Sequence, residues 1–305
     1  MEKDIMNEPL LKERSYVKSM SAGVRLPLRH PWGFLRHLWP MMVACVVVWA
    51  VVAQWASASV WQFREMAFAP TTDAGHVLSV PFFMLCGWGL LAIVLLGVLC
   101  GQISDLMHRY AELGYLPAVQ PWKVMPDITP HVVRGIILCV VGYALTVGWA
   151  VLSLMVMPSR MWALVLFVLL TILWAMIYVP AGQQYMMERK GFGASLAWPF
   201  AHMGSLGGSS AILVVCGMVV VLVMLAGCLP ALSTIFVGGM SDNAVAIGDG
   251  TDLPSSFGLV RSICFAMGAL VVTLAWPFIL VPLCFQWGGS SLHNLPEKPE
   301  DDEHE

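Results

Sequence analysis

The chain has 305 residues, of which 58% are hydrophobic and 11% are charged, and its formal net charge is −3. A soluble domain carries roughly 25% charged residues, so this composition excludes a soluble globular protein and indicates an integral membrane protein. The near-neutral charge, with no stripe of Lys and Arg among stacking aromatic residues, also argues against nucleic-acid binding.

The first 38 residues are predicted to be a cytoplasmic arm, and because they hold acidic residues but no apolar core, we expect no cleavable signal peptide. The arm leads into HPWGFLRHLWP (30–40), which we call the interfacial segment. As a short helix it puts tryptophans on one stripe and arginines on another. This is typical of a helix with rings at headgroup depth and arginines toward anionic lipid. The predicted anchors are Arg29, Trp32, Arg36 and Trp39.

The two histidines of the interfacial segment, His30 and His37, are interpreted as part of its wet face, because no acid or cysteine stands near them in the sequence. Pro40 suits the first turn of the span that follows. A shorter echo of the segment, Trp198-Pro-Phe200, stands before the fifth apolar run. We therefore predict a second anchor at Trp198 and Phe200.

Six apolar runs are long enough to cross a membrane as helices of about 20 residues. They define a transmembrane domain over 39–288, with spans at 39–58, 80–100, 132–156, 161–181, 211–236 and 260–287. The predicted fold class is all-α, a polytopic bundle of six transmembrane helices. Four prolines in the later runs are positions where a helix can end or kink: Pro180, Pro230, Pro277 and Pro282. The acidic tail, 289–305, is expected to be disordered.

The basic residues are distributed unequally between the two sides of this arrangement. Thirteen of the sixteen lysines and arginines fall in the arm, in or at the edges of the loops after spans two and four, or in the tail, and the other side has only Arg64, Arg160 and Arg261. The positive-inside rule therefore places both termini in the cytoplasm, and an even number of spans agrees. We expect a bacterial inner membrane, since the outer loops hold no N-x-Ser/Thr acceptor.

The first and last pairs of spans share a series of weak matches in the same order. Trp32-x-Phe34 is matched by Trp198-x-Phe200, and Cys100-x-Gln102 by Cys284-x-Gln286. Such matches are expected from a parallel internal repeat about an axis along the membrane normal. Coincidence within a restricted amino-acid alphabet explains them equally well, and both alternatives stay open.

The linker AGQQYMMERKGFGASLAWPFAHMGSL (181–206) has a distinct layout: a helix leaves the membrane, a charged turn follows, and a stretch rich in small residues re-enters. This layout resembles a broad group of six-helix bacterial membrane proteins, including the membrane domain attached to some glycerophosphodiester phosphodiesterases. The resemblance covers the six-span layout. No stretch of the chain corresponds to a soluble phosphodiesterase domain, so the resemblance implies a fold and no catalytic residue.

The chemistry that the residues offer is limited. The apolar cores contain no Asp, Glu, Lys, Arg or His, which argues against proton relays and ion-coupled pumps. The eight cysteines lie within or at the ends of apolar runs without a C-x-x-C pair, so neither zinc nor a disulfide framework is indicated. No H-E-x-x-H, G-x-S-x-G or P-loop motif is present. We therefore expect no enzymatic activity, no metal and no cofactor.

The best candidate site is the cytoplasmic mouth. GQISDLMHRYAELG (101–114) is predicted to continue span two as an amphipathic helix, beyond a close helix contact at Gly97-x-x-x-Gly101. Its charged residues share one face, and the favoured interpretation is an i,i+4 pair, Asp105–Arg109, on a wet surface. The alternative is a polar vestibule for a small headgroup or solute. Its candidate binding residues are Gln102, Asp105, His108, Gln183, Gln184, Gln286 and His293.

Two classes of function stay open. The first is a non-enzymatic scaffold, assembly or lipid-interacting component that acts through membrane lipids, other membrane proteins or self-association. The uncharged cores, the short loops and the basic, aromatic entry segments favour it. The second is a permease for a neutral or lipid-like solute, which the repeat and the prolines of the late helices favour.

Overall fold

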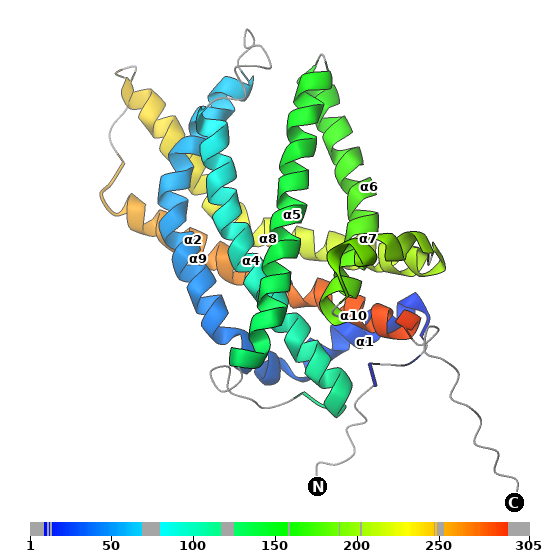
Figure 1. The fold of residues 1–305 in the computed structure, drawn as a ribbon. Helices are drawn as coiled ribbons and strands as arrows, with labels where there is room; N and C mark the ends of the chain where they lie inside the picture. Colours follow the sequence, from blue (N-terminus) through cyan, green and yellow to red (C-terminus); the bar gives the residue numbers. More distant parts are fainter. Residues whose placement is uncertain are drawn as a thin grey trace, which may run out of the picture.

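The computed structural model describes residues 9–10, 12, 14–68, 80–116, 125–157, 159–188, 190–201, 203–246, 248 and 253–291. Over these residues the regular structure is entirely helical (Figure 1). The helices are α1 (Tyr16–Arg29), α2 (Pro31–Phe68), α4 (Val80–Leu113), α5 (Met125–Val156), α6 (Arg160–Met187), α7 (Phe192–Ala201), α8 (Met203–Ala246), α9 (Phe257–Ala275) and α10 (Pro277–Ser291).

Six helical stretches of the described chain are long and apolar enough to cross a membrane. They are Pro31–Val52, Val80–Leu113, Ile128–Val156, Met161–Met187, Ser209–Asp242 and Phe257–Gly289. Each overlaps one of the predicted spans. The chain is therefore an all-α, polytopic integral membrane protein, and the predicted fold class is confirmed.

Span two continues well past the apolar run that predicts it. α4 extends through the amphipathic stretch to Leu113, as expected. It ends where Gly114 adopts a φ of +72°, a conformation that glycine reaches without a steric penalty. The Gly114 N–H donates a hydrogen bond of 3.0 Å to the carbonyl of Tyr110, which satisfies one of the last carbonyls of the helix.

The four prolines differ in their effect on the helices. Pro180, Pro230 and Pro282 lie inside continuous helices. Pro277 breaks the last span: α9 ends at Ala275, Trp276 lies in a turn, and α10 begins at Pro277. Proline has no N–H to donate to the preceding turn and suits the first position of a new helix. Trp276 keeps helical dihedral angles, its N–H donates to the carbonyl of Val272, and its own carbonyl accepts from the N–H of Leu280, so α9 and α10 form one span that is interrupted only locally at Pro277.

The packed core lies at one end of the helices. There α1 and α10 lie side by side, at the lower end of the view in Figure 1. The core joins α1, α2, α4, α6 and α10 through buried side chains that include Leu26, Phe34, Leu106, Met187 and Phe285. The far ends of α5 and α6 instead expose Leu152, Met155, Met161 and Leu164. In a membrane protein such exposed apolar side chains face lipid.

Small residues allow α4 and α5 to approach closely. A Cβ added at Gly101 would lie 2.5 Å from the Cα of Val132, and one at Gly97 would lie 2.7 Å from the Cα of Ile136. Gly135 on α5 meets the carbonyl of Gly97 in the same contact. The close helix contact predicted from Gly97-x-x-x-Gly101 is confirmed, and its partner is α5.

The interfacial segment is not a separate short helix. Arg29 ends α1, and the residues from Pro31 onward belong to α2, which runs through Pro40 without a break. The prediction that Pro40 opens the first span was wrong, because the helix had already begun one residue after His30. The predicted boundary between residues 38 and 39 thus falls inside one continuous helix.

Candidate functional site

A buried cluster of charge lies where α2 meets the lower part of α4. The carboxylate of Asp105 accepts a 2.9 Å hydrogen bond from the Nε of Arg109, one helical turn away. The Nε2 of His37 on α2 lies 3.9 Å from the same Oδ2. We call these three residues the Asp105 cluster. Asp105 and His37 are only 3% and 2% exposed.

This burial corrects two interpretations. The i,i+4 pair is confirmed, but its wet surface was wrong, because α2 packs over this face of α4. His37 was likewise expected on the wet face of the interfacial segment and is enclosed instead. Burying a carboxylate costs free energy unless the charge is paired. The hydrogen bond from Arg109 therefore offsets the cost of burying Asp105.

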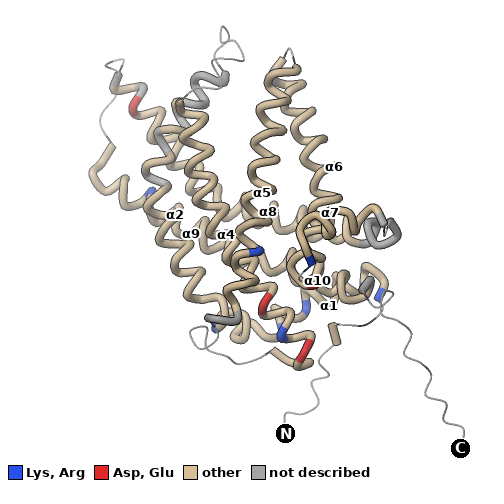
Figure 2. Tube along the Cα trace, viewed as in Figure 1, with Lys and Arg blue, Asp and Glu red and all other residues tan. Residues whose placement is uncertain are grey.

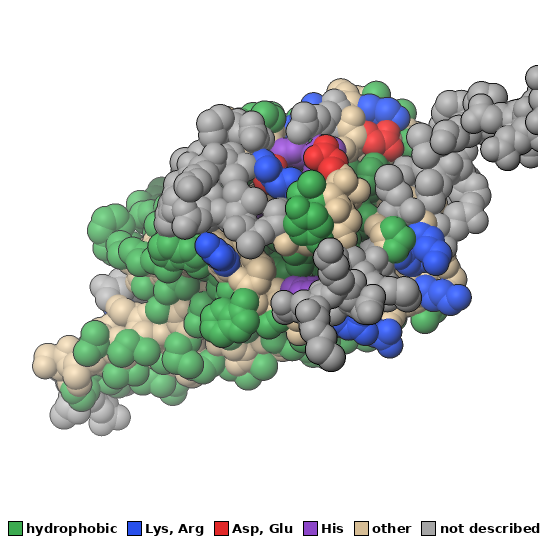
Figure 3. All heavy atoms as spheres, turned by 90° about the horizontal axis from the view of Figure 1, so that it is seen from below, with side chains coloured by type: hydrophobic (Ala, Val, Ile, Leu, Met, Phe, Trp, Pro, Cys, Tyr) green, Lys and Arg blue, Asp and Glu red, His purple; other side chains and the backbone are tan. Residues whose placement is uncertain are grey.

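The rest of the predicted charged face lies nearer the end of α4. His108 is half-buried, its Nε2 lies 3.3 Å from an Oε1 of Glu112, and its ring centroid is 5.5 Å from that of His131 on α5. The carboxylate of Glu112 is 63% exposed. Charged groups gather at this end of the molecule (Figure 2), and the view onto it shows acidic, basic and histidine side chains beside one another (Figure 3).

The predicted glutamines lie where α6 meets α10. The Nε1–H of Trp287 donates a 2.9 Å hydrogen bond to the Oε1 of Gln184, which is fully buried. The thiol of Cys284 donates to the Oε1 of Gln183 at 3.4 Å. Gln286 is 9% exposed on α10. These polar groups hold two helices together, and the vestibule stays a prediction.

The remaining predicted residues are distributed as follows. Gln102 is half-buried on α4, one turn from Asp105, and His293 lies outside the described residues. Of the predicted anchors, Trp32 is 80% exposed and Trp39 is 45% exposed, while Arg29 and Arg36 are exposed as well. On α7, Phe200 is 60% exposed and Trp198 is half-buried. This exposure suits a position at the membrane surface, and the anchor role stays a prediction.

An amphipathic helix that the sequence reading missed precedes the interfacial segment. α1 buries Ala22, Gly23 and Leu26 against its neighbours, chiefly α10. Gly23 is required there, because a Cβ would collide with the backbone of Pro282. A stripe beside this buried face exposes Lys18, Arg25 and Arg29. Their spacing of seven and four residues, which places them on one stripe, is the signal that could have revealed the helix.

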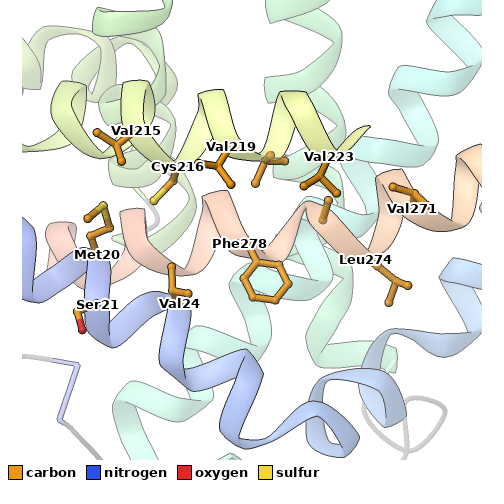
Figure 4. Close-up of a pocket in the computed structure, with 12 residues that line it drawn as sticks. Met20, Ser21, Val24, Val215, Cys216, Val219, Val223, Val271, Leu274 and Phe278 are labelled. Atoms are coloured by element: carbon orange, nitrogen blue, oxygen red, sulfur yellow. The ribbon is translucent and has the colours of Figure 1, made fainter. Parts of the chain in front are cut away.

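A large apolar cavity lies beside α1. Its volume is about 640 Å³, and it is bounded by α1, α8, α9 and α10. It is open along α8, where Val219 is 55% exposed. Met20 and Val24 of α1 point toward α8, and Val219 and Val223 of α8 point back (Figure 4). We call it the α1 cavity. The cavity could not be predicted from the sequence, because apolar residues occupy every face of α8, so no hydrophobic periodicity distinguishes the face that lines the cavity.

A second apolar cavity adjoins the first. It has a volume of about 450 Å³ and lies between the end of α1, the start of α2 and the broken span. Leu274 and Phe278, on either side of the break, line both cavities. The two cavities therefore flank the proline interruption at Trp276–Pro277.

Metal ligation finds no support in the described part of the chain, where no group of three or more His, Cys, Asp or Glu side chains could hold an ion. The candidate site thus combines two features: the buried polar contacts at the packed end of the bundle, and two apolar cavities next to the basic helix α1. In comparisons with known proteins, no family model, no curated protein and no solved structure matches the chain.

Proposed function

We propose that the protein is a non-enzymatic membrane component that acts by binding phospholipid at the end of the bundle that carries α1 and α10. The observation that carries this proposal is the arrangement of α1. This helix presents a stripe of exposed basic residues, Lys18, Arg25 and Arg29, beside an open, hydrocarbon-lined cavity that the last two spans border. Basic residues attract anionic headgroups, and apolar hollows accept acyl chains.

The polar residues near this end support a structural role over a catalytic one. Asp105 is paired with Arg109, and Gln184 accepts its hydrogen bond from Trp287. An enzyme would need a nucleophile and a base, or paired acids, arranged around a substrate. The contacts seen here instead join α6 to α10 and anchor charge between α2 and α4.

Location in an inner membrane with both termini in the cytoplasm is part of the proposal. The excess of basic residues on that side, thirteen of sixteen in the sequence, supports it. Anionic lipids give the cytoplasmic leaflet a negative surface potential, to which the exposed stripe of α1 is complementary.

A second function is favoured by one observation, the break in the last span. Proline-interrupted helices often mark substrate sites in transporters. Here the break at Trp276–Pro277 lies between two apolar cavities, so that a permease for a lipid-like solute would have both a site and a hinge. The central parts of the predicted apolar runs hold no charged residue, which favours a neutral or lipid-like cargo over an ion.

Thermal unfolding of delipidated protein tests the proposal. Adding phosphatidylglycerol in detergent should raise Tm, because a ligand at 100 times its Kd stabilises the folded state by about 2.7 kcal/mol. Phosphatidylcholine should raise it less. Equal Tm values with and without either lipid would contradict the proposal, and facilitated solute exchange in proteoliposomes would favour the permease.

A further inference from the structure

The α1 cavity has the size and lining of a ligand site. Its volume of about 640 Å³ falls within the roughly 300–1,000 Å³ that ligand pockets occupy. Apart from Ser21, the lining side chains are hydrocarbon or sulfur-bearing apolar groups, among them Met20, Val219 and Phe278. Apart from the hydroxyl of Ser21, such a surface offers no side-chain hydrogen bonds for a polar solute. It favours a flexible hydrocarbon chain, whose burial is driven by contact area alone.

The helix that bounds the cavity also supplies positive charge at its rim. Ser21 lines the cavity, and on the α1 surface it neighbours Lys18, three residues before it, and Arg25, four residues after it. Both basic side chains are exposed. A ligand with its chain inside the cavity can therefore place an anionic group beside two cations.

The position of the cavity restricts the ligand to the membrane. Val215 to Val223 lie inside the fifth span, and Leu274 and Phe278 lie inside the sixth. A molecule that enters from the bilayer brings an acyl chain at this depth and a headgroup at its surface. Bilayer phospholipids meet both conditions, and the charge at the rim selects those with an anionic headgroup.

We infer that the α1 cavity holds an acyl chain of an anionic phospholipid, with its phosphate against Lys18 and Arg25. The inference rests on the proposed function and makes it specific. The second cavity, which shares Leu274 and Phe278 with the first, gives the other acyl chain of the same lipid a place further along α1, beside Pro27 and Leu28.

Photo-crosslinking in vesicles tests this site. The full chain is reconstituted in phosphatidylcholine vesicles that contain phosphatidylglycerol with a diazirine on one acyl chain, and labelled peptides are identified by mass spectrometry. Labelling should be concentrated at 215–223 and 271–278 and should be removed by excess unlabelled phosphatidylglycerol. The lipid-facing part of α6 (Met161–Leu173), which exposes many apolar side chains, supplies the background level in the same sample.

Val219→Trp fills the cavity and should reduce labelling at these two stretches to the background level of α6. Val221→Trp is the matched control, because Val221 is exposed on the same helix and does not line the cavity. Its labelling should equal that of the wild-type protein. Unchanged labelling of α6 in both variants shows that the bundle has folded.

The double variant Lys18→Gln with Arg25→Gln tests whether these two residues bind the anionic headgroup. Both side chains are exposed, so the changes do not disturb the core. The labelling by phosphatidylglycerol should fall roughly tenfold or more at limiting probe, because each basic residue near an anionic surface adds to the affinity. It should then match that of the same probe with a choline headgroup. If the phosphatidylglycerol and phosphatidylcholine probes label the wild-type protein equally, the inference that the site selects an anionic headgroup is wrong.

Two outcomes separate the site from the function. Labelling that persists in Val219→Trp, with phosphatidylglycerol still raising Tm, would overturn the α1 cavity as the site and leave lipid binding in place. Labelling at background in the wild-type protein together with an unchanged Tm would overturn both.

Discussion

The Nε of Arg109 donates a 2.9 Å hydrogen bond to the Oδ2 of Asp105, whose side chain is only 4% exposed. The Nε2 of His37, from a different helix, lies 3.9 Å from the same oxygen. The carboxylate of Asp105 can remain ionised and buried only while Arg109 pairs with it, since a buried unpaired carboxylate is strongly unfavourable. The pair therefore makes the burial of Asp105 under α2 depend on one hydrogen bond within α4.

Replacing Arg109 by Gln should destabilise the protein more than replacing both members of the pair. The single change leaves the carboxylate of Asp105 enclosed without its cation, at a cost of about 2 kcal/mol or more. Asp105→Asn with Arg109→Gln removes the charge as well and should recover part of this loss. Thermal unfolding in detergent measures both. Equal Tm values for Arg109→Gln and the wild-type protein would show that the pair contributes nothing.

Gly101→Ala should separate α4 from α5. The new Cβ would lie 2.5 Å from the Cα of Val132, and backbone atoms cannot move aside as a flexible side chain can. We expect a loss of about 1–3 kcal/mol, the usual cost of overpacking. Gly87→Ala in the same helix is the control, because nothing lies within 4 Å of its added Cβ. Similar Tm values for the two variants would contradict the close contact.

Trp287→Phe should weaken the contact between α6 and α10. The change keeps an aromatic ring and removes the donor to Gln184, whose amide is fully buried, so a loss of about 1–3 kcal/mol is expected. Trp32→Phe, at a position that is 80% exposed, should change stability by less than about 0.5 kcal/mol. If the two variants unfold at the same temperature, the hydrogen bond does not stabilise the bundle.

Trp32→Ala with Trp39→Ala should impair insertion or orientation of the first span rather than remove a binding activity. Both rings are exposed at the start of α2, where aromatic side chains favour the headgroup region. Protease accessibility of terminal tags in sealed vesicles reports the orientation. The wild-type protein should show both tags on the cytoplasmic side, and a tag accessible only from outside would contradict the topology.

Apolar run length predicts the six spans well, because a helix that crosses hydrocarbon needs about 20 apolar residues and little else. Glycine spacing likewise predicted the contact at Gly97 and Gly101. Proline alone was ambiguous: of the four in the later spans, only Pro277 ends a helix, and the others lie within continuous helices. Which proline breaks a helix depends on whether neighbours compensate for the missing N–H, and this is a tertiary property.

The candidate site was predictable in its residues and not in its surroundings. The spacing of Asp105 and Arg109 gave their pairing, but nothing local revealed that α2 would cover them and enclose His37. Gln184 was placed at the right end of span four, while its partner Trp287 lies 103 residues further along the chain. The α1 cavity left no trace in the sequence, since its lining consists of the same residues that face lipid elsewhere.

Native mass spectrometry of the wild-type protein, purified in a mild detergent from membranes that contain phosphatidylglycerol, tests lipid binding most directly. The prediction is a dominant ion of the 33.4 kDa chain with at least one anionic phospholipid retained. That adduct should be reduced in the variant with Lys18→Gln and Arg25→Gln. A bare chain, or a stoichiometric complex with a second protein and no retained lipid, would contradict the proposed function.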